Sequence, residues 1–206
     1  LGVWIVGRLL NSWRQLYLPA QKLLKQLNYL GVPHSNFIEL PEKSVAAFTV
    51  GILQSKVFLS RGLLALCTDQ DVKTILAHEQ AHQRRFDNLR RIIAGLLVAP
   101  LPQSLTRVMM DDHQLLCEQA CDDSAAEGVS REKVAATVLK VARLQRPTPN
   151  YVSAFADSHT RFRIEVLLKT SRSPLPEALL YVGSFIALAL FLTLVDPLHH
   201  FLEWLH

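Results

Sequence analysis

Cysteine is scarce in this sequence, and repeats and low-complexity tracts are absent from it. The 206 residues include three cysteines, Cys67, Cys117 and Cys121, an odd count without the regular spacing of a disulfide framework. This usage favours a reducing compartment over an oxidising one. Cys117 and Cys121 lie four residues apart, so they share a helix face and could bind metal. Burial as small hydrophobic side chains is the favoured interpretation.

The sequence also lacks a concentration of charge of one sign. Its 22 basic and 18 acidic side chains give a net charge of +4 and are spread along the chain. No nucleic-acid-binding arm is therefore indicated. The absence of a C-x-x-C-H motif argues against haem attachment. The length of the chain suits one catalytic domain with membrane helices beside it.

Half of the residues are hydrophobic and the mean hydropathy is positive, which points to a membrane element. Residues 178–195 contain no charged side chain, a length that is sufficient to cross a bilayer. We predict a transmembrane helix over residues 175–198 and a short tail over 199–206, with a buried core helix as the alternative. Residues 1–10 are apolar but too short to span, and are predicted to be the end of another transmembrane helix.

Basic residues place the segment between these two helices on the cytoplasmic side. Lys and Arg follow the first apolar segment and precede the second, and none follows the second: Arg8, Arg14, Lys22 and Lys25, then Lys169 and Arg172. By the positive-inside rule, residues 11–174 form a cytoplasmic domain. This predicts a multi-pass protein of a bacterial-type inner membrane that contacts the lipid bilayer.

Periodicity predicts a mainly helical α+β domain. Residues 37–60 are rich in β-branched and aromatic side chains between turn formers, and we expect a small antiparallel sheet there. Thr68 is a good N-cap for a helix that continues past residue 80. Further helices are expected over residues 14–30, ending at Gly31, over 92–101 as a buried or interfacial helix, and over 104–126 and 130–144.

The helix that follows Thr68 carries the pattern H-E-x-x-H. His78 and His82 are four residues apart and project from one helix face, so both imidazoles can bind one zinc ion. Glu79 then points at the catalytic water and is the predicted general base. The pattern therefore predicts metal-assisted peptide hydrolysis.

A catalytic zinc ion needs a third protein ligand, and Glu118 is the best candidate. It begins an E-x-x-x-D pattern whose last residue, Asp122, lies one turn further and can orient a ligand histidine through its second ring nitrogen. Asp123 is the alternative for this orienting role. His113 is the alternative third ligand, although its polar neighbours suit a surface position better.

These residues resemble the BlaR/MecR-type, antirepressor-like membrane zinc metallopeptidases of the gluzincin clan. The resemblance covers about residues 45–170 and includes Arg85 and Asp87, which match an H-x-x-R-x-D extension of the metal helix. It implies a gluzincin-like zinc domain in a cytoplasmic loop between membrane helices. It also implies a regulatory endopeptidase whose substrate is a protein, such as a transcriptional repressor. Direct β-lactam sensing is not supported, because only about ten residues follow the C-terminal helix.

The neighbouring family of heat-shock and prenyl-processing membrane zinc peptidases shares this core. Its downstream His and Arg element is similar to residues 158–164, which assigns His159 and Arg163 to the oxyanion or to steadying the site. A surface histidine on a basic helix explains these two residues equally well. A signalling or scaffold protein with a structural or vestigial zinc site is the second functional hypothesis, and a quality-control peptidase of this neighbouring family is a further alternative.

Overall fold

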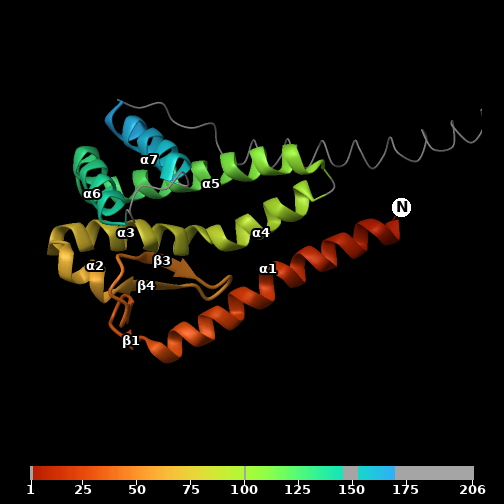
Figure 1. The fold of residues 1–206 in the computed structure, drawn as a ribbon, viewed down its shortest axis with the longest axis horizontal. Coiled ribbons are helices and arrows are strands. Elements are labelled where there is room, and N and C mark those ends of the chain that lie inside the picture. The colour runs from red at the N-terminus through yellow and green to blue at the C-terminus, as the bar shows by residue number, and fades with distance from the viewer. Residues whose placement is uncertain (1, 100, 146–152, 170–206) are drawn as a thin grey trace, which may run out of the picture.

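The computed structural model describes residues 2–99, 101–145 and 153–169, which form a mainly helical domain around a small sheet (Figure 1). In chain order the elements are α1 (Gly2–Leu30), β1 (Val32–Pro33), β2 (Ile38–Leu40), β3 (Ala47–Val50), β4 (Lys56–Ser60), α2 (Arg61–Leu66), α3 (Asp69–Arg85), α4 (Asp87–Val98), α5 (Gln103–Ala126), α6 (Arg131–Leu144) and α7 (Ser153–Leu168). The helices predicted near 104–126 and 130–144 are confirmed as α5 and α6.

The sheet is mixed, so the prediction of an antiparallel sheet is wrong for one pair of strands. Its strand order is β1-β2-β4-β3, and β2 runs parallel to β4 while the other neighbours are antiparallel. The chain leaves β2 for the outer position of β3 and returns through a hairpin into β4. Since β4 has the most continuously buried residues of the four strands, it occupies a central position and leaves β3 at the edge.

Helices cover both faces of the sheet (Figure 1). On one face, Phe58 and its buried neighbours pack against Leu24 and Leu27 of α1. On the other face, Leu59 packs with Leu63 and with Ile75 of α3. The alternation of side chains along β4 therefore holds α1 and α3 on opposite sides of the strands.

Helix α3 begins and ends at well-defined residues. The Thr68 hydroxyl accepts a hydrogen bond from the backbone N–H of Asp71, and the Asp71 carboxylate accepts one from the Thr68 N–H, which confirms the predicted cap as a full capping box. At the other end Phe86 has φ 54° and ψ 41°, a left-handed conformation. This conformation is strained for a bulky side chain. Phe86 thereby ends α3 and starts α4 at Asp87.

A second layer packs on α3 and consists of α5, α6 and α7 (Figure 1). Val134 and Ala135 of α6 pack with Ala125 of α5 and Leu167 of α7, all four being buried. The Arg131 Nε donates a hydrogen bond to the Leu167 carbonyl at 3.3 Å. This packing holds α7 against α5, on the side of the domain opposite the sheet.

The first helix is longer than predicted, because residues 1–10 are not separated from the amphipathic segment. From residue 2 onward both belong to α1, which contains Pro19 and ends at Leu30, so the predicted stop at Gly31 is confirmed. None of the helices in the described ranges is long and apolar enough to span a bilayer. The transmembrane helix predicted over 175–198 and the tail over 199–206 lie outside the described residues.

Candidate metal centre

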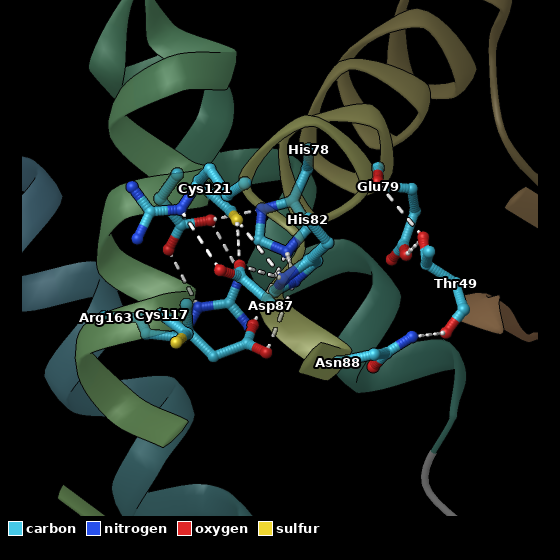
Figure 2. A network of polar contacts seen from close by, with 12 residues as sticks. Thr49, His78, Glu79, His82, Asp87, Asn88, Cys117, Cys121 and Arg163 are labelled. Atoms are coloured by element: carbon cyan, nitrogen blue, oxygen red, sulfur yellow. Dashed lines mark hydrogen bonds and ion pairs between the residues drawn. The ribbon is translucent and has the colours of Figure 1, made fainter. Parts of the chain in front are cut away.

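Helix α3 brings His78 and His82 together on one face, as the H-E-x-x-H spacing predicts (Figure 2). Their ring centroids are 4.8 Å apart with the planes nearly perpendicular, and the two Nε2 atoms are 3.2 Å apart. Two neutral imidazoles whose Nε2 atoms both carry lone pairs repel each other at this distance unless a cation or proton lies between them. The pair is therefore arranged to share a positive centre.

Glu118 of α5 supplies the third side chain. Its Oε2 lies 3.4 Å from His78 Nε2, and its Oε1 lies 3.6 Å from His82 Nε2. Tetrahedral ligands about 2.1 Å from zinc are separated by about 3.4 Å from one another. The three separations bracket that value, with one Glu118 oxygen near each imidazole, and two imidazole nitrogens with a carboxylate are a donor set that zinc prefers. His78, His82 and Glu118 therefore fit a single zinc ion.

An aspartate contacts the Nδ1 atom of each imidazole, on the side opposite Nε2. Asp122 Oδ1 lies 3.0 Å from His78 Nδ1, and Asp87 Oδ2 lies 2.9 Å from His82 Nδ1. A carboxylate at Nδ1 keeps the proton there and directs the Nε2 lone pair toward the metal position. Arg85 Nε in turn lies 3.4 Å from Asp87 Oδ1, and the turn at Phe86 places Asp87 behind His82.

Arg163 of α7 connects two of the acidic residues of α5, Asp122 and Glu118. Its Nε and Nη2 donate to Oδ2 and Oδ1 of Asp122 at 2.8 and 2.7 Å, and its Nη1 lies 2.7 Å from Glu118 Oε2. Asp122 is 1% exposed. Such a bidentate pair is geometrically specific and keeps a buried carboxylate compensated. Arg163 therefore fixes both carboxylates and ties α7 to the centre.

The electrostatics favour a positive charge between the imidazoles. Burial lowers the pKa of His78, but Asp122 and Glu118 outweigh it and raise the pKa to about 9. Burial raises the pKa of Glu118, whereas His78 and Arg163 outweigh it and lower the pKa to about 2. These carboxylates therefore favour a cation between the two imidazoles, and a bound metal ion would satisfy them.

Asp123, the alternative orienting residue, and His113, the alternative third ligand, have other partners. Asp123 forms an ion pair with Arg131 at 2.7 Å, whereas Asp122 lies at His78 Nδ1, so Asp123 does not take the orienting role that we left open for it. His113 Nε2 lies 3.7 Å from Cys117 Sγ and is not grouped with the three ligands. Asp122, rather than Asp123, is the residue behind His78.

Cys117 and Cys121 are buried, as the favoured interpretation predicts. Cys117 is 6% exposed and Cys121 is 0% exposed. Cys121 Sγ nevertheless lies 3.2 Å from His82 Nδ1 and 3.4 Å from Asp87 Oδ2, so His82, Asp87 and Cys121 form a second group with the composition of a metal site. Burial and the Asp87 charge raise the pKa of the Cys121 thiol far above its ordinary value. The Asp87 carboxylate already engages His82 Nδ1 at 2.9 Å, so this group is best explained as a support for His82.

A cavity of about 240 Å³ opens onto the centre. Its polar lining includes Glu79 and the three candidate ligands, and its other wall consists of apolar residues of α3 and α6: Ile75, Val134, Val138, Val141 and Ala142. Thr160 and Arg163 are the described residues of α7 that line it. His159 is half-buried on α7 and is not in that lining, and its predicted role at the oxyanion stays a prediction.

Strand β3 runs along the other side of the centre. Ala47, Phe48 and Thr49 line a second cavity of about 270 Å³ that also reaches Glu79 and Glu118. Because the Ser60 N–H bonds the Ala46 carbonyl, the alternation of an antiparallel pair turns the N–H and C=O groups of residues 47 and 49 away from β4. These groups form the open edge of the sheet, beside the candidate base.

Two residues at this edge were not identified from the sequence. The Thr49 hydroxyl lies 2.9 Å from Glu79 Oε2 and 3.1 Å from the Glu79 carbonyl (Figure 2). The Asn88 amide donates to the carbonyls of Thr49 and Gly51 at 3.2 and 2.8 Å. The alternation of β3 could have indicated that Thr49 faces α3. Nothing in the sequence indicates Asn88, one residue past the Asp of the H-x-x-R-x-D pattern.

Comparison with known proteins agrees with this geometry. A protease HtpX homolog from Sulfurovum sp. (strain NBC37-1) is 28% identical to the chain over 88 residues, which are 42% of this chain and 31% of that protein. The chain thus spans about a third of that relative. The family model for peptidase family M48 matches residues 14–156, more than half of the chain. The protein therefore belongs to peptidase family M48.

Proposed function

We propose that this protein is a zinc-dependent endopeptidase in which His78, His82 and Glu118 hold the metal and Glu79 is the general base. The observation that carries the proposal is the convergence of two imidazole Nε2 atoms and one carboxylate, with spacings of 3.2 to 3.6 Å, at the edge of an open cavity. Membership of peptidase family M48 supports it. A zinc ion held there supplies Lewis-acid activation of the peptide carbonyl and of water.

The side chains around the ligands have separate tasks in this proposal. Glu79 takes a proton from the attacking water and passes it to the leaving amine nitrogen. Asp122 and Asp87 hold the histidine Nδ1 protons, so that each Nε2 remains a ligand. Arg163 keeps Glu118 ionised and in place, since its guanidinium lies 2.7 Å from Glu118 Oε2.

The substrate that fits this site is an extended polypeptide. The open edge of β3 offers backbone groups that can pair with a peptide as an added strand, next to Glu79. The apolar wall that α6 contributes to the other cavity suits an aliphatic side chain close to the scissile bond. Backbone pairing gives affinity for any extended segment, and the wall adds a preference for apolar residues.

Two biological settings suit such an activity. The HtpX homolog favours a quality-control peptidase that degrades membrane or membrane-proximal proteins. The H-x-x-R-x-D and E-x-x-x-D patterns, shared with the antirepressor-like peptidases, favour regulatory cleavage of a cytoplasmic protein such as a repressor. Both settings need the same catalytic centre, a bilayer location for the full protein and a cytoplasmic zinc domain.

The direct test is cleavage of a loosely folded protein by the full chain loaded with zinc, with fluorescently labelled casein as the probe. Glu79→Gln keeps the shape of the side chain and removes its basicity, so it should retain one zinc per chain and lose cleavage. Gln80→Glu, at the neighbouring position of the same helix, is the matched control and should retain cleavage. Cleavage by Glu79→Gln at the wild-type rate would remove Glu79 from its role. Bound zinc without cleavage in the wild type would favour the scaffold hypothesis.

A further inference from the structure

Thr49 connects edge strand β3, along which we propose that the substrate pairs, with Glu79, the candidate base. Its backbone belongs to edge strand β3, and its N–H faces outward, where a paired peptide would lie. Its side chain points to the opposite element, α3, and contacts Glu79 (Figure 2). One residue therefore links the position of the peptide to the position of the carboxylate.

The shorter of the two Thr49 contacts engages one carboxylate oxygen of Glu79, Oε2, and thereby orients the other carboxylate oxygen. An ionised carboxylate only accepts hydrogen bonds, so the Thr49 hydroxyl is the donor to Oε2 at 2.9 Å. Glu79 is 8% exposed, and it lines both cavities at the centre. A glutamate has several side-chain rotamers, and a fixed donor on one oxygen selects the rotamer in which the other faces the attacking water.

Asn88 fixes Thr49 in turn. Its amide nitrogen bonds the outward carbonyls of Thr49 and Gly51, two successive acceptors on the open edge of the sheet. Gly51 has φ 114°, and a Cβ there would lie 2.7 Å from the Gln54 carbonyl, so the strand must end at this turn. Asn88 therefore closes the edge after Thr49. With respect to the described part of the chain, the outward groups of β3 that stay available to a peptide are the Ala47 N–H, the Ala47 C=O and the Thr49 N–H.

We propose that Thr49 and Asn88 are positioning residues: Thr49 orients the Glu79 carboxylate through its hydroxyl, and Asn88 clamps the edge strand that carries Thr49 and ends the pairing of the substrate there. The proposal rests on the proposed function, because it assigns Glu79 as the base. It adds that the base is held from the substrate-binding strand and not from its own helix. The spacing between the paired peptide and the base is then set by a single residue.

The proposal predicts different kinetic effects for substitutions that keep or remove the hydroxyl. Thr49→Val preserves the shape and removes the donor, so kcat should fall by roughly 10- to 100-fold with KM within about 2-fold, since misplacement of a reacting group by about 1 Å costs about 100-fold. Thr49→Ser keeps the donor and should restore kcat to within about 3-fold of the wild type. Asn88→Ala loosens both the strand and Thr49, so it should lower kcat and raise KM together.

The kinetic assay uses a quenched fluorescent decapeptide and the full chain loaded with zinc. Thr106→Val is the control for the general loss of a threonine hydroxyl. Thr106 lies on α5, and its hydroxyl donates to the Val98 carbonyl and not to Glu79. It should leave kcat unchanged. An unchanged kcat in Thr49→Val, or equal losses in Thr49→Ser and Thr49→Val, would overturn the orienting role of the hydroxyl.

A structural readout decides the inference if the proposed function itself fails. Should the wild type show no cleavage that depends on Glu79, the peptidase proposal falls, and crystal structures of the wild type and Thr49→Val can still be compared. A Glu79 carboxylate that changes rotamer in Thr49→Val supports the positioning contact. A carboxylate that keeps its place without the hydroxyl contradicts it.

Discussion

Replacing Asp122 with asparagine isolates the contribution of a buried carboxylate that touches no substrate. Asp122 Oδ1 lies 3.0 Å from His78 Nδ1, and the same carboxylate accepts two hydrogen bonds from Arg163. Asparagine keeps the size of the side chain and removes its charge. His78 Nδ1 then faces a neutral amide in place of a carboxylate anion, and Arg163 loses one of its two anions.

The expected loss can be placed in a range. Removal of the group behind a metal-binding histidine typically weakens metal binding by about 10- to 100-fold, or about 1.4 to 2.7 kcal/mol. We therefore expect Asp122→Asn to bind zinc about 10- to 100-fold more weakly than the wild type, as measured by competition with a chelator of known affinity. Cleavage measured at saturating zinc should fall less than zinc affinity does.

The neighbouring residue provides a matched control. Asp123→Asn removes the same charge one position later, where the carboxylate is about one-third exposed and pairs with Arg131. An exposed pair contributes about 0 to 1 kcal/mol to stability, and zinc affinity should not change. Wild-type zinc affinity in Asp122→Asn, or equal losses in both variants, would refute the assignment of Asp122 to His78.

Three further results are expected. Burial raises the pKa of Asp71, but Lys140 and Thr68 outweigh it and hold the pKa below its ordinary value. The ionised Asp71 therefore stabilises the fold above a pH of about 4, and this stabilisation is lost as the pH falls further. Asp71→Asn should therefore lower the free energy of unfolding at pH 7 and have a smaller effect near pH 2; an equal effect at both would contradict this. Ala142→Phe narrows the cavity at its apolar wall, so it should raise KM for peptides with a large aliphatic side chain more than for alanine peptides. An equal change in KM for both kinds of peptide would show that the wall does not select the substrate. Zinc at about 100 times its Kd should stabilise the protein by about 2.7 kcal/mol in thermal unfolding, and Glu118→Ala should lose most of this gain.

Local signals in the sequence predicted much of the centre. The spacing of His78 and His82 on a helix dictates that they share a face, and Thr68 with its capping partner marks where that helix starts. The spacing of Glu118 and Asp122 likewise places both side chains toward α3, where the structure has them. These features depend on neighbours within one or two helical turns, which is the range over which sequence patterns are informative.

The remaining features depend on contacts between distant segments. Thr49 meets Glu79 across 30 residues, and Asn88 meets Thr49 across 39. A threonine in a strand and an asparagine in a helix are common without any such contact. The parallel pairing of β2 with β4 also escaped prediction, because strand order follows from which strand is buried on both faces and not from alternation within one strand.

The most direct test of the centre is X-ray absorption at the zinc edge, measured on the full chain loaded with one zinc per chain. The ligand set of His78, His82 and Glu118 predicts two nitrogen scatterers at about 2.0 to 2.1 Å and oxygen at about 2.0 to 2.2 Å, with no sulfur. Glu118→Ala should change the oxygen shell and leave the imidazole signals. A sulfur scatterer at about 2.3 Å would place the metal at His82, Asp87 and Cys121 instead and contradict the assigned centre.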